Sequence, residues 1–128
     1  MARVLVIDDD AVFRGIAGTA LRDAGHVVEE ASDGQAGVDA FRKSKVPFDV
    51  VIVDMYMPGM DGIDTIFEMD AGTKGARVIA VTGGHTMGTD TLRLAGSAGA
   101  DLTLEKDFTP EELVKAVEGL LPKKTKKG

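Results

Sequence analysis

Apolar residues are distributed along this chain in two ways: in short runs of mostly β-branched residues, and in longer segments where they recur every three to four positions. The short runs are typical of buried strands, and the longer segments are typical of amphipathic helices. Five strands are predicted, at residues 3–7, 27–31, 50–53, 77–81 and 100–104. Five helices are predicted, at residues 11–24, after a cap at Ser32 or Asp33, and at residues 63–69, 89–97 and 110–121. This alternation predicts one α/β domain whose parallel five-stranded sheet is covered by helices on both faces.

Single residues predict where several helices begin and end. Asp10 is expected to cap the first helix, and Gly25 to end it. Thr109 and Glu112 form the pattern of a capping box, with Pro110 at the first helical position. The predicted inward residues are Val12, Phe13, Ile16, Ala17, Ala20 and Leu21 in the first helix, Ala36, Val38, Ala40 and Phe41 in the second, and Val114, Val117, Leu120 and Leu121 in the last.

A lone carboxylate, Asp54, ends the most apolar of the predicted strands. Open α/β sheets bind ligands in the crevice beyond the carboxyl ends of their strands. The pairs Pro58-Gly59 and Asp61-Gly62 follow closely, and both pairs favour turns. The sequence therefore predicts that Asp54 is presented on a shaped loop.

Polar residues also follow the other strands. Asp8 and Asp9 come after the first strand, Thr82 after the fourth and Lys106 after the fifth. Because parallel strands end at one edge of a sheet, we expect these side chains to meet Asp54. Crowded carboxylates need a cation, and an oxygen-only set suits Mg²⁺, with Mn²⁺ as an alternative. With an ammonium and a hydroxyl added, such a site can stabilise a phosphoryl group in transfer to a carboxylate.

Length and composition limit what the chain can be. Its 128 residues fit one domain and leave no room for a second catalytic, output or DNA-binding domain. No apolar run approaches the roughly 20 residues of a membrane span, and the N-terminus lacks the pattern of an export signal. With no cysteine, the sequence is compatible with the cytoplasm, which is where we expect the protein to act.

The net charge of −6 is unevenly distributed. The last six residues include four lysines: Lys123, Lys124, Lys126 and Lys127. Removing them from the 15 basic residues leaves 11 against 21 acidic ones, a net charge of −10. A body this acidic is a poor binder of nucleic acid. We therefore expect a domain at residues 1–121 and a solvated lysine-rich tail at 122–128, although such a tail could also contact nucleic acid or anionic lipid.

Four motifs lie at the predicted strand ends: VLVIDDD at the first strand, DVVIVDMYMPGMDG at the third, VIAVTGG at the fourth and EKDF after the fifth. Together they resemble the receiver domain of two-component response regulators, in particular the stand-alone, chemotaxis-type receivers. The resemblance runs from Arg3 to Leu121. It implies a flavodoxin-like, doubly wound (βα)5 fold with strand order 2-1-3-4-5.

The resemblance also implies a role for each residue at the strand ends. It makes Asp54 the phosphoacceptor, Thr82 the hydroxyl that turns toward the phosphoryl group, and Lys106 its cationic partner. The magnesium ligands that it implies are Asp8, Asp9, Asp54 and the backbone carbonyl of Tyr56.

A receiver-like function follows from the same resemblance. The chain would be a single-domain response regulator that takes a phosphoryl group from a phosphohistidine of a sensor histidine kinase or a histidine phosphotransfer protein. It would catalyse its own phosphorylation and dephosphorylation, and would not be an enzyme acting on another substrate. A changed face of the fourth helix, fifth strand and fifth helix would then bind a downstream protein partner, with the chain a monomer or weak dimer.

The sequence departs from the family pattern at a few positions. Asp107 follows Lys106 where proline is common, often after a cis bond, so Lys106 either bears the cost of a cis bond or approaches the site differently. Thr103 stands where many members carry an aromatic ring that moves on activation. Tyr56 and Gly84 occupy positions that shape the access of water to the phosphoryl group.

Two other functions are compatible with parts of the sequence. One is a receiver-like interaction module that works without phosphorylation. The other is a haloacid-dehalogenase-type phosphatase, whose first motif is matched by Asp8, Asp10 and Val12, with Thr82 and Lys106 imitating the next two. The phosphatase needs a late acidic pair that this chain lacks, and it leaves Asp54 without a role.

The remaining methionines and histidines are interpreted as structural or solvated. Met55, Met57 and Met60 are expected to pack the loop after the third strand and not to form a partner surface. His26 and His85 are expected to be solvated and not to be metal ligands.

Overall fold

The computed structural model describes residues 1–57, 59–83 and 89–121. The elements in chain order are β1 (Arg3–Ile7), α1 (Ala11–Asp23), β2 (Val27–Ala31), α2 (Gly34–Lys43), β3 (Val50–Asp54), α3 (Gly62–Met69), the 3-10 helix η1 (Ala71–Lys74), β4 (Arg77–Thr82), α4 (Thr89–Ala98), β5 (Leu102–Glu105) and α5 (Pro110–Leu120). The five strands form one parallel sheet in the order β2-β1-β3-β4-β5. The predicted flavodoxin-like fold is confirmed.

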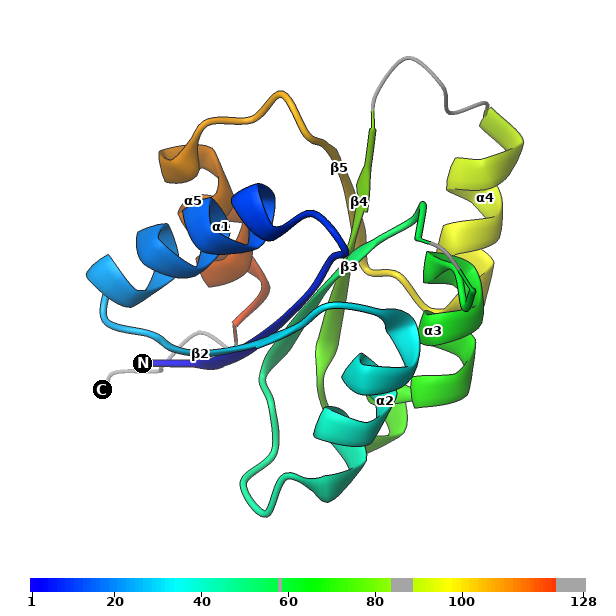
Figure 1. Cartoon of the computed structure of the whole chain (residues 1–128), viewed down its shortest axis with the longest axis horizontal. Coiled ribbons are helices and arrows are strands. Elements are labelled where there is room, and N and C mark those ends of the chain that lie inside the picture. Colours follow the sequence, from blue (N-terminus) through cyan, green and yellow to red (C-terminus); the bar gives the residue numbers. More distant parts are fainter. Residues whose placement is uncertain (58, 84–88, 122–128) are drawn as a thin grey trace.

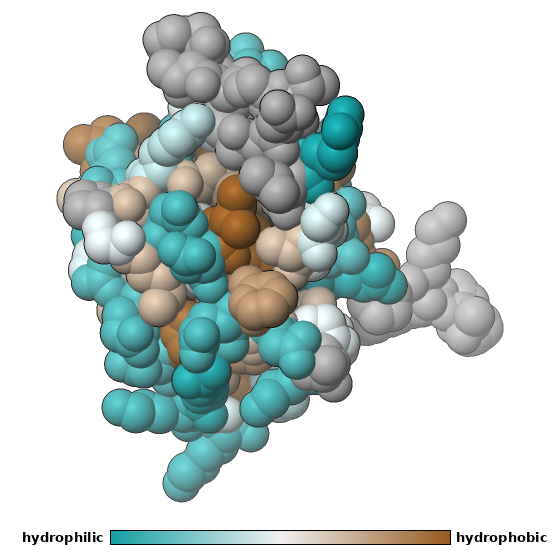
Figure 2. All heavy atoms as spheres, turned by 90° about the vertical axis from the view of Figure 1, so that its right-hand side faces the viewer, coloured by the Kyte–Doolittle hydropathy of each residue, from teal (hydrophilic) through white to brown (hydrophobic). Residues whose placement is uncertain are grey.

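Helices cover both faces of the sheet (Figure 1). Helices α1 and α5 lie on one face, and α2, α3 and α4 lie on the other. Seen from the side of α2, α3 and α4, the surface is mostly hydrophilic, with a small group of apolar side chains near its middle (Figure 2). No helix in the described ranges is long and apolar enough to cross a membrane.

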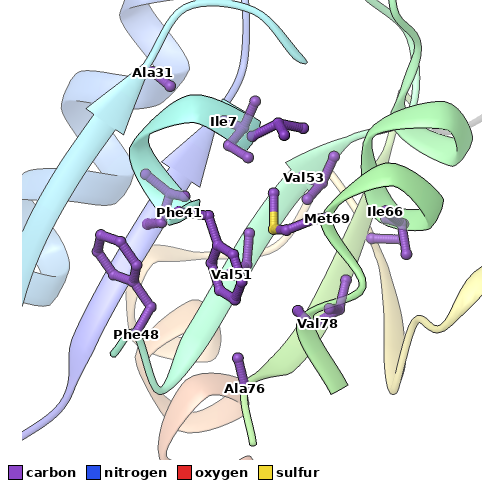
Figure 3. Packing of buried hydrophobic residues seen from close by; sticks show 14 of the residues in the cluster. Ile7, Ala31, Phe41, Phe48, Val51, Val53, Ile66, Met69, Ala76 and Val78 are labelled. Carbon is purple, nitrogen blue, oxygen red and sulfur yellow. The ribbon is translucent and has the colours of Figure 1, made fainter. Parts of the chain in front are cut away.

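Two hydrophobic clusters hold the helices against the sheet, one on each face. Successive residues of β1 alternate between them: Leu5 and Ile7 join one cluster, and Val4 and Val6 the other. Figure 3 shows the first cluster, in which Ile7, Val51 and Val53 from the sheet meet side chains from the covering helices. Every residue of β3 is buried, and each fully buried Val or Ile contributes about 1.5–3 kcal/mol. The central strand is thus the most firmly held part of the sheet.

The methionines near Asp54 behave as predicted. Met55 and Met57 are buried members of the first cluster, and Met60 packs against it partly buried. They fill the space between the loop after β3 and the helices on that face. These side chains contribute to loop packing and not to an exposed partner surface.

Polar caps begin several helices as the sequence predicts. The Asp10 carboxylate accepts hydrogen bonds from the backbone N–H groups of Val12 and Phe13, and Asp33 caps α2. The complete capping box of Thr109 and Glu112 begins α5. Helix α3 has a cap that was not predicted: the Asp61 carboxylate accepts a hydrogen bond from the backbone N–H of Asp64.

The predicted inward face of α1 is partly wrong. Val12 and Ile16 are 70% and 53% exposed, whereas Ala17, Gly18 and Leu21 are buried. Six apolar residues within ten positions cover more of the helix than one packing face can bury. The small residues Ala17 and Gly18 face inward, which leaves the two β-branched side chains in solvent.

The prediction of a solvated His26 is also wrong. This residue is only 7% exposed and lies in the connection between α1 and β2. Its Nδ1 accepts a hydrogen bond from the backbone N–H of Ala2 at 3.0 Å, and its Nε2 lies 3.0 Å from an oxygen of Glu118 on α5. The ring therefore joins the start of β1 to the last helix, a contact between residues far apart in the sequence.

Smaller differences concern element boundaries. Part of the expected polar loop at 72–75 forms η1, and β5 begins at Leu102, two residues later than predicted. The predicted turn at Pro58, the end signal at Pro122, the lysine tail, Gly84 and His85 lie outside the described residues.

Helix α2 approaches the sheet so closely that one position requires glycine. A Cβ atom at Gly37 would lie 2.3 Å from Cδ1 and 2.7 Å from Cγ1 of the buried Ile7. Gly15, in α1, is exposed and has no neighbour within 4 Å of such an atom. We expect Gly37→Ala to lower the free energy of unfolding by about 1–3 kcal/mol through overpacking, despite the better helix propensity of alanine.

The matched control is Gly15→Ala, which should raise the free energy of unfolding by up to about 1 kcal/mol. Urea denaturation of both variants measures the two changes. Equal effects of the two substitutions would contradict the close packing of α2 on β1.

Candidate functional site

The sheet register brings the predicted site residues to one edge. The backbone N–H of Asp8 donates to the carbonyl of Ala31, and Asp54 lies opposite Val81 in the neighbouring strand. The backbone N–H of Lys106 donates to the carbonyl of Thr82 at 2.9 Å. The strand ladders therefore extend into the residues that carry the polar side chains.

Three carboxylates gather at this edge. Asp8, Asp9 and Asp54 each offer an oxygen, and these oxygens lie within 4.8 Å of one another. Asp8 is fully buried and Asp54 is 4% exposed, whereas Asp9 is open to solvent. Two buried carboxylates at this separation repel each other unless other groups offset their charge.

Lys106 supplies part of that compensation. Its Nζ lies 2.9 Å from Oδ2 of Asp8 and 3.6 Å from Oδ2 of Asp54. The described residues contain no cis peptide bond, so Lys106 reaches both carboxylates with a trans bond to the exposed Asp107. The sequence left open either a cis bond after Lys106 or a different approach of its side chain. The bond is trans, so the first of these does not apply.

Backbone groups hold the two buried carboxylates in place. Oδ1 of Asp8 accepts a hydrogen bond from the N–H of Asp10 at 2.9 Å, and Oδ1 of Asp54 accepts one from the N–H of Tyr56 at 3.2 Å. Arg14 was not predicted to belong to the site, yet its guanidinium donates to the backbone carbonyl of Asp8 at 2.7 Å. Its place in the first turn of the helix after the acidic run was the signal available. Arg14 thus fixes the backbone of Asp8 from α1.

Helix α3 packs directly on the loop that follows Asp54. A Cβ atom at Gly62 would lie 2.5 Å from both the carbonyl oxygen of Asp54 and Cα of Met55. The N–H of Gly62 also donates to the carbonyl of Met55 at 3.3 Å. This close approach of two backbones holds the end of β3 against the start of the next helix.

Burial determines the protonation of Asp54. It raises the pKa of this carboxyl group from 3.8 to about 7. The hydrogen bond from the Tyr56 N–H and the charge of Lys106 lower the pKa, and the charge of Asp8 raises it. Burial lowers the pKa of the Lys106 ammonium, but its hydrogen bond to Asp8 and the charges of Asp54 and Asp8 outweigh burial, so its pKa lies above the ordinary value.

Thr82 contributes a buried hydroxyl at the end of β4. Its side chain is 1% exposed, and its Oγ1 has no hydrogen-bond partner among the described residues. A buried hydroxyl without a partner costs free energy in the fold. It is suited to a role as a donor to a group that enters the site.

The donor set fits a hard divalent cation. Its three members offer carboxylate oxygens only, and no nitrogen or sulfur ligand belongs to the cluster that the described part of the chain forms. Mg²⁺ and Mn²⁺ prefer oxygen ligands, and a partly open site leaves room for the waters that Mg²⁺ retains. The predicted fourth ligand, the backbone carbonyl of Tyr56, stays a prediction.

The phosphatase hypothesis finds no support at this edge. It requires the Asp10 carboxylate in the first catalytic motif, but that carboxylate caps α1 by accepting from Val12 and Phe13. Asp54, which the hypothesis leaves without a role, is instead a member of the acidic cluster.

Comparison with known proteins identifies the class of protein. The protein-family model of the response regulator receiver domain matches residues 4–118, so the chain belongs to this family. Receiver domains are signalling proteins of two-component systems, they interact with histidine kinases, and they bind Mg²⁺ through an acidic pocket. This chain has an acidic cluster of Asp8, Asp9 and Asp54.

Individual relatives support the same family. The chain is 33% identical over 119 residues to TcrX, a probable transcriptional regulatory protein of Mycobacterium tuberculosis, covering 92% of this chain and 49% of the relative. The structure resembles that of the chemotaxis protein CheY4 of Vibrio cholerae with a TM-score of 0.85, at 30% identity over 94% of this chain and 99% of that one. A response regulator from Burkholderia pseudomallei, crystallised with a phosphorylated aspartic acid, a calcium ion and citrate, matches with a TM-score of 0.80 at 25% identity, covering 95% and 67%. The chain spans about half the length of TcrX and of several other curated relatives.

The raised pKa of Asp54 predicts a stability effect with a definite sign. The folded protein holds the Asp54 proton up to about pH 7, whereas the unfolded chain releases it near 3.8. Asp54 therefore lowers stability progressively as pH rises from about 4 to 7, and by a constant amount above 7. Without magnesium, we expect Asp54→Asn to raise the free energy of unfolding by roughly 1–3 kcal/mol at pH 8.

The difference between the variant and the wild type should shrink as pH falls toward 4. Urea denaturation in the presence of a chelator, repeated at several pH values, measures it. A difference that grows as pH falls would show that the charge of Asp54 is stabilised in the fold and not opposed.

Proposed function

We propose that this chain accepts a phosphoryl group on Asp54 from a phosphohistidine of a sensor histidine kinase or a histidine phosphotransfer protein. One observation carries the proposal. This chain belongs to the receiver family, and oxygens of its Asp8, Asp9 and buried Asp54 lie within 4.8 Å of one another. The Lys106 ammonium lies 3.6 Å from Oδ2 of Asp54. A nucleophilic carboxylate and groups able to offset phosphoryl charge thus share one pocket.

The transfer step uses the Asp54 carboxylate as nucleophile. An Asp54 oxygen forms a bond to phosphorus while the bond from phosphorus to the imidazole nitrogen of the donor breaks. The nitrogen keeps the electron pair, and the product is an acyl phosphate on Asp54. Because the charge develops on the phosphoryl oxygens, positioning and electrostatic stabilisation supply most of the catalysis.

Neighbouring side chains would serve the charged group during and after transfer. Lys106 stands close enough to Asp54 to pair with a phosphoryl oxygen, and the Thr82 hydroxyl is free to donate within the described residues. Asp54 must be ionised to attack, and a pKa of about 7 leaves a large ionised fraction at neutral pH. Burial around Asp54 also restricts the access of water to the product.

Asp8, Asp9 and Asp54 would hold Mg²⁺ or Mn²⁺, with the carbonyl of Tyr56 as a further ligand. When bound, the cation offsets the negative charge of the carboxylates and of the phosphoryl oxygens. The phosphorylated aspartic acid and calcium ion in the similar regulator from Burkholderia pseudomallei support this assignment by analogy.

The phosphoryl group would act as a switch. It adds nearly two negative charges beside Thr82, and the response would pass to the face of α4, β5 and α5. Thr103 lies half-buried on β5, too small to replace an aromatic ring in this change. The altered face would bind a downstream protein in the cytoplasm, with the receiver acting as a monomer or weak dimer.

Phosphorylation can be tested by intact mass after incubation with acetyl phosphate and Mg²⁺. We expect a gain of about 80 Da, one phosphoryl group, that requires the metal and is absent in Asp54→Asn. The matched control is Asp64→Asn, which removes an exposed carboxylate of α3 and should be labelled like the wild type. Failure of the wild type to gain mass under any condition would favour the interaction module that works without phosphorylation.

Metal binding can be tested separately through stability. Mg²⁺ at 10 to 100 times its Kd should raise the free energy of unfolding by about 1–3 kcal/mol, because it binds the folded site and relieves carboxylate repulsion. Asp9→Asn should greatly reduce this gain while preserving the fold, since Asp9 is exposed. Thermal unfolding with and without Mg²⁺ measures the gain, and Asp23→Asn, an exposed carboxylate at the end of α1, is the control. An equal gain in all three proteins would contradict the assigned metal site.

A further inference from the structure

The Lys106 ammonium has an aromatic neighbour in addition to the two carboxylates. Its Nζ lies 4.7 Å from the centre of the Phe13 ring, and it is 2.9 Å from Asp8 and 3.6 Å from Asp54. Phe13 is half-buried in the first turn of α1. The cation thus lies close to two carboxylates and to the face of an aromatic ring.

A second aromatic ring connects the same helix to the backbone beside Lys106. Phe108, two residues after Lys106, packs edge to face against Phe13, with ring centres 5.9 Å apart and planes at 68°. The backbone N–H of Phe108 donates to the carbonyl of Glu105 at 3.4 Å, which closes a turn around Lys106. The Lys106 ammonium and the ring of Phe108, two residues further along the chain, therefore both contact Phe13.

This arrangement addresses a weakness of lysine as a site residue. A lysine side chain is flexible, and that of Lys106 is 25% exposed, so solvent competes with the carboxylates for its ammonium group. The face of an aromatic ring attracts a cation, which favours conformations in which the ammonium stays beside the ring. The ring can restrict the ammonium to the pocket without neutralising its charge.

We propose that Phe13 is a positioning residue, which holds Lys106 toward Asp54 through its ring face and through its packing against Phe108. The proposal rests on the proposed function, because it assigns Phe13 a part in the same phosphoryl transfer. Phe13 does not touch the reacting atoms, and it acts through Lys106.

The kinetic test compares two substitutions at position 13. With acetyl phosphate and Mg²⁺, Phe13→Leu should slow the labelling of Asp54 roughly three- to tenfold, because leucine lacks the ring face. Phe13→Tyr keeps the ring and should label within about twofold of the wild-type rate. In a Lys106→Ala background, Phe13→Leu should cause no further loss, because the two residues act as one unit.

The structural test uses proton NMR without metal or phosphoryl donor. The ε-methylene protons of Lys106 should be shifted upfield by the ring in the wild type and in Phe13→Tyr. The shift should be lost in Phe13→Leu. This measurement reports the contact itself and does not depend on phosphorylation.

The chain offers a matched control at the opposite edge of the sheet. Cζ of Arg3 lies over the Phe48 ring at the same distance, 4.7 Å from its centre, and Phe48 stacks on Phe41. Phe48→Leu removes the aromatic ring from the pair of Arg3 and Phe48. It should lower the free energy of unfolding, because Phe48 is a buried member of the first hydrophobic cluster. It should leave both the labelling rate at equal folded concentration and the Lys106 shift unchanged.

The outcomes separate this proposal from the proposed function. If the wild type is labelled but Phe13→Leu labels equally fast, or if the effects of Phe13→Leu and Lys106→Ala are additive, the positioning role is wrong. If the wild type is not labelled at all, the proposed function fails and the NMR measurement decides on Phe13. If the wild type then shows no upfield shift of the Lys106 ε-methylene protons, the contact between Phe13 and Lys106 is wrong. If the shift is present in the wild type and in Phe13→Tyr but absent in Phe13→Leu, the contact is supported.

Discussion

Repulsion between two buried carboxylates is the constraint on which this structure depends. Asp8 and Asp54 are almost completely removed from water, yet their oxygens lie within 4.8 Å of each other. The surrounding groups offset this cost: backbone N–H groups bind one oxygen of each carboxylate, and Lys106 approaches both. The compensation is incomplete, because burial still raises the pKa of Asp54 to about 7. The ionised form of the Asp54 carboxyl group is therefore disfavoured, and a bound cation or phosphoryl group can change this.

The remainder of the fold supplies the rigidity that keeps these groups together. The central strand β3 is buried along its whole length, and its carboxyl end is held by the close approach of Gly62 in α3. On the other side of the sheet, α1 contributes Arg14 to the backbone of Asp8 and Phe13 to the ammonium of Lys106. The site is therefore assembled from the ends of four strands, β1, β3, β4 and β5, and from the first turns of two helices. Packing in the two hydrophobic clusters offsets the free-energy cost of burying the carboxylates.

Helix α1 shows how one element can serve both packing and the site. Ala17 and Leu21 bury its middle and last turns, and Asp10 caps its start. This orientation leaves Val12 and Ile16 exposed but places Phe13 and Arg14 beside the acidic cluster. The periodicity of apolar residues shows that a helix forms, but a wide apolar surface does not determine which side faces the sheet.

The sequence by itself determined the alternation of strands and helices, the parallel sheet, the caps at Asp10 and Thr109, and the gathering of polar residues at strand ends. Each of these follows from local chemistry, from spacing, or from the rule that parallel strands end at one edge. Only the tertiary structure decided the burial of His26 between Ala2 and Glu118, the contact of Phe13 with Lys106, and the unpaired hydroxyl of Thr82 among the described residues. These features depend on side chains that are up to 93 residues apart in the chain, as are Phe13 and Lys106. Their contacts arise only when helices pack at particular rotations, which no local pattern specifies.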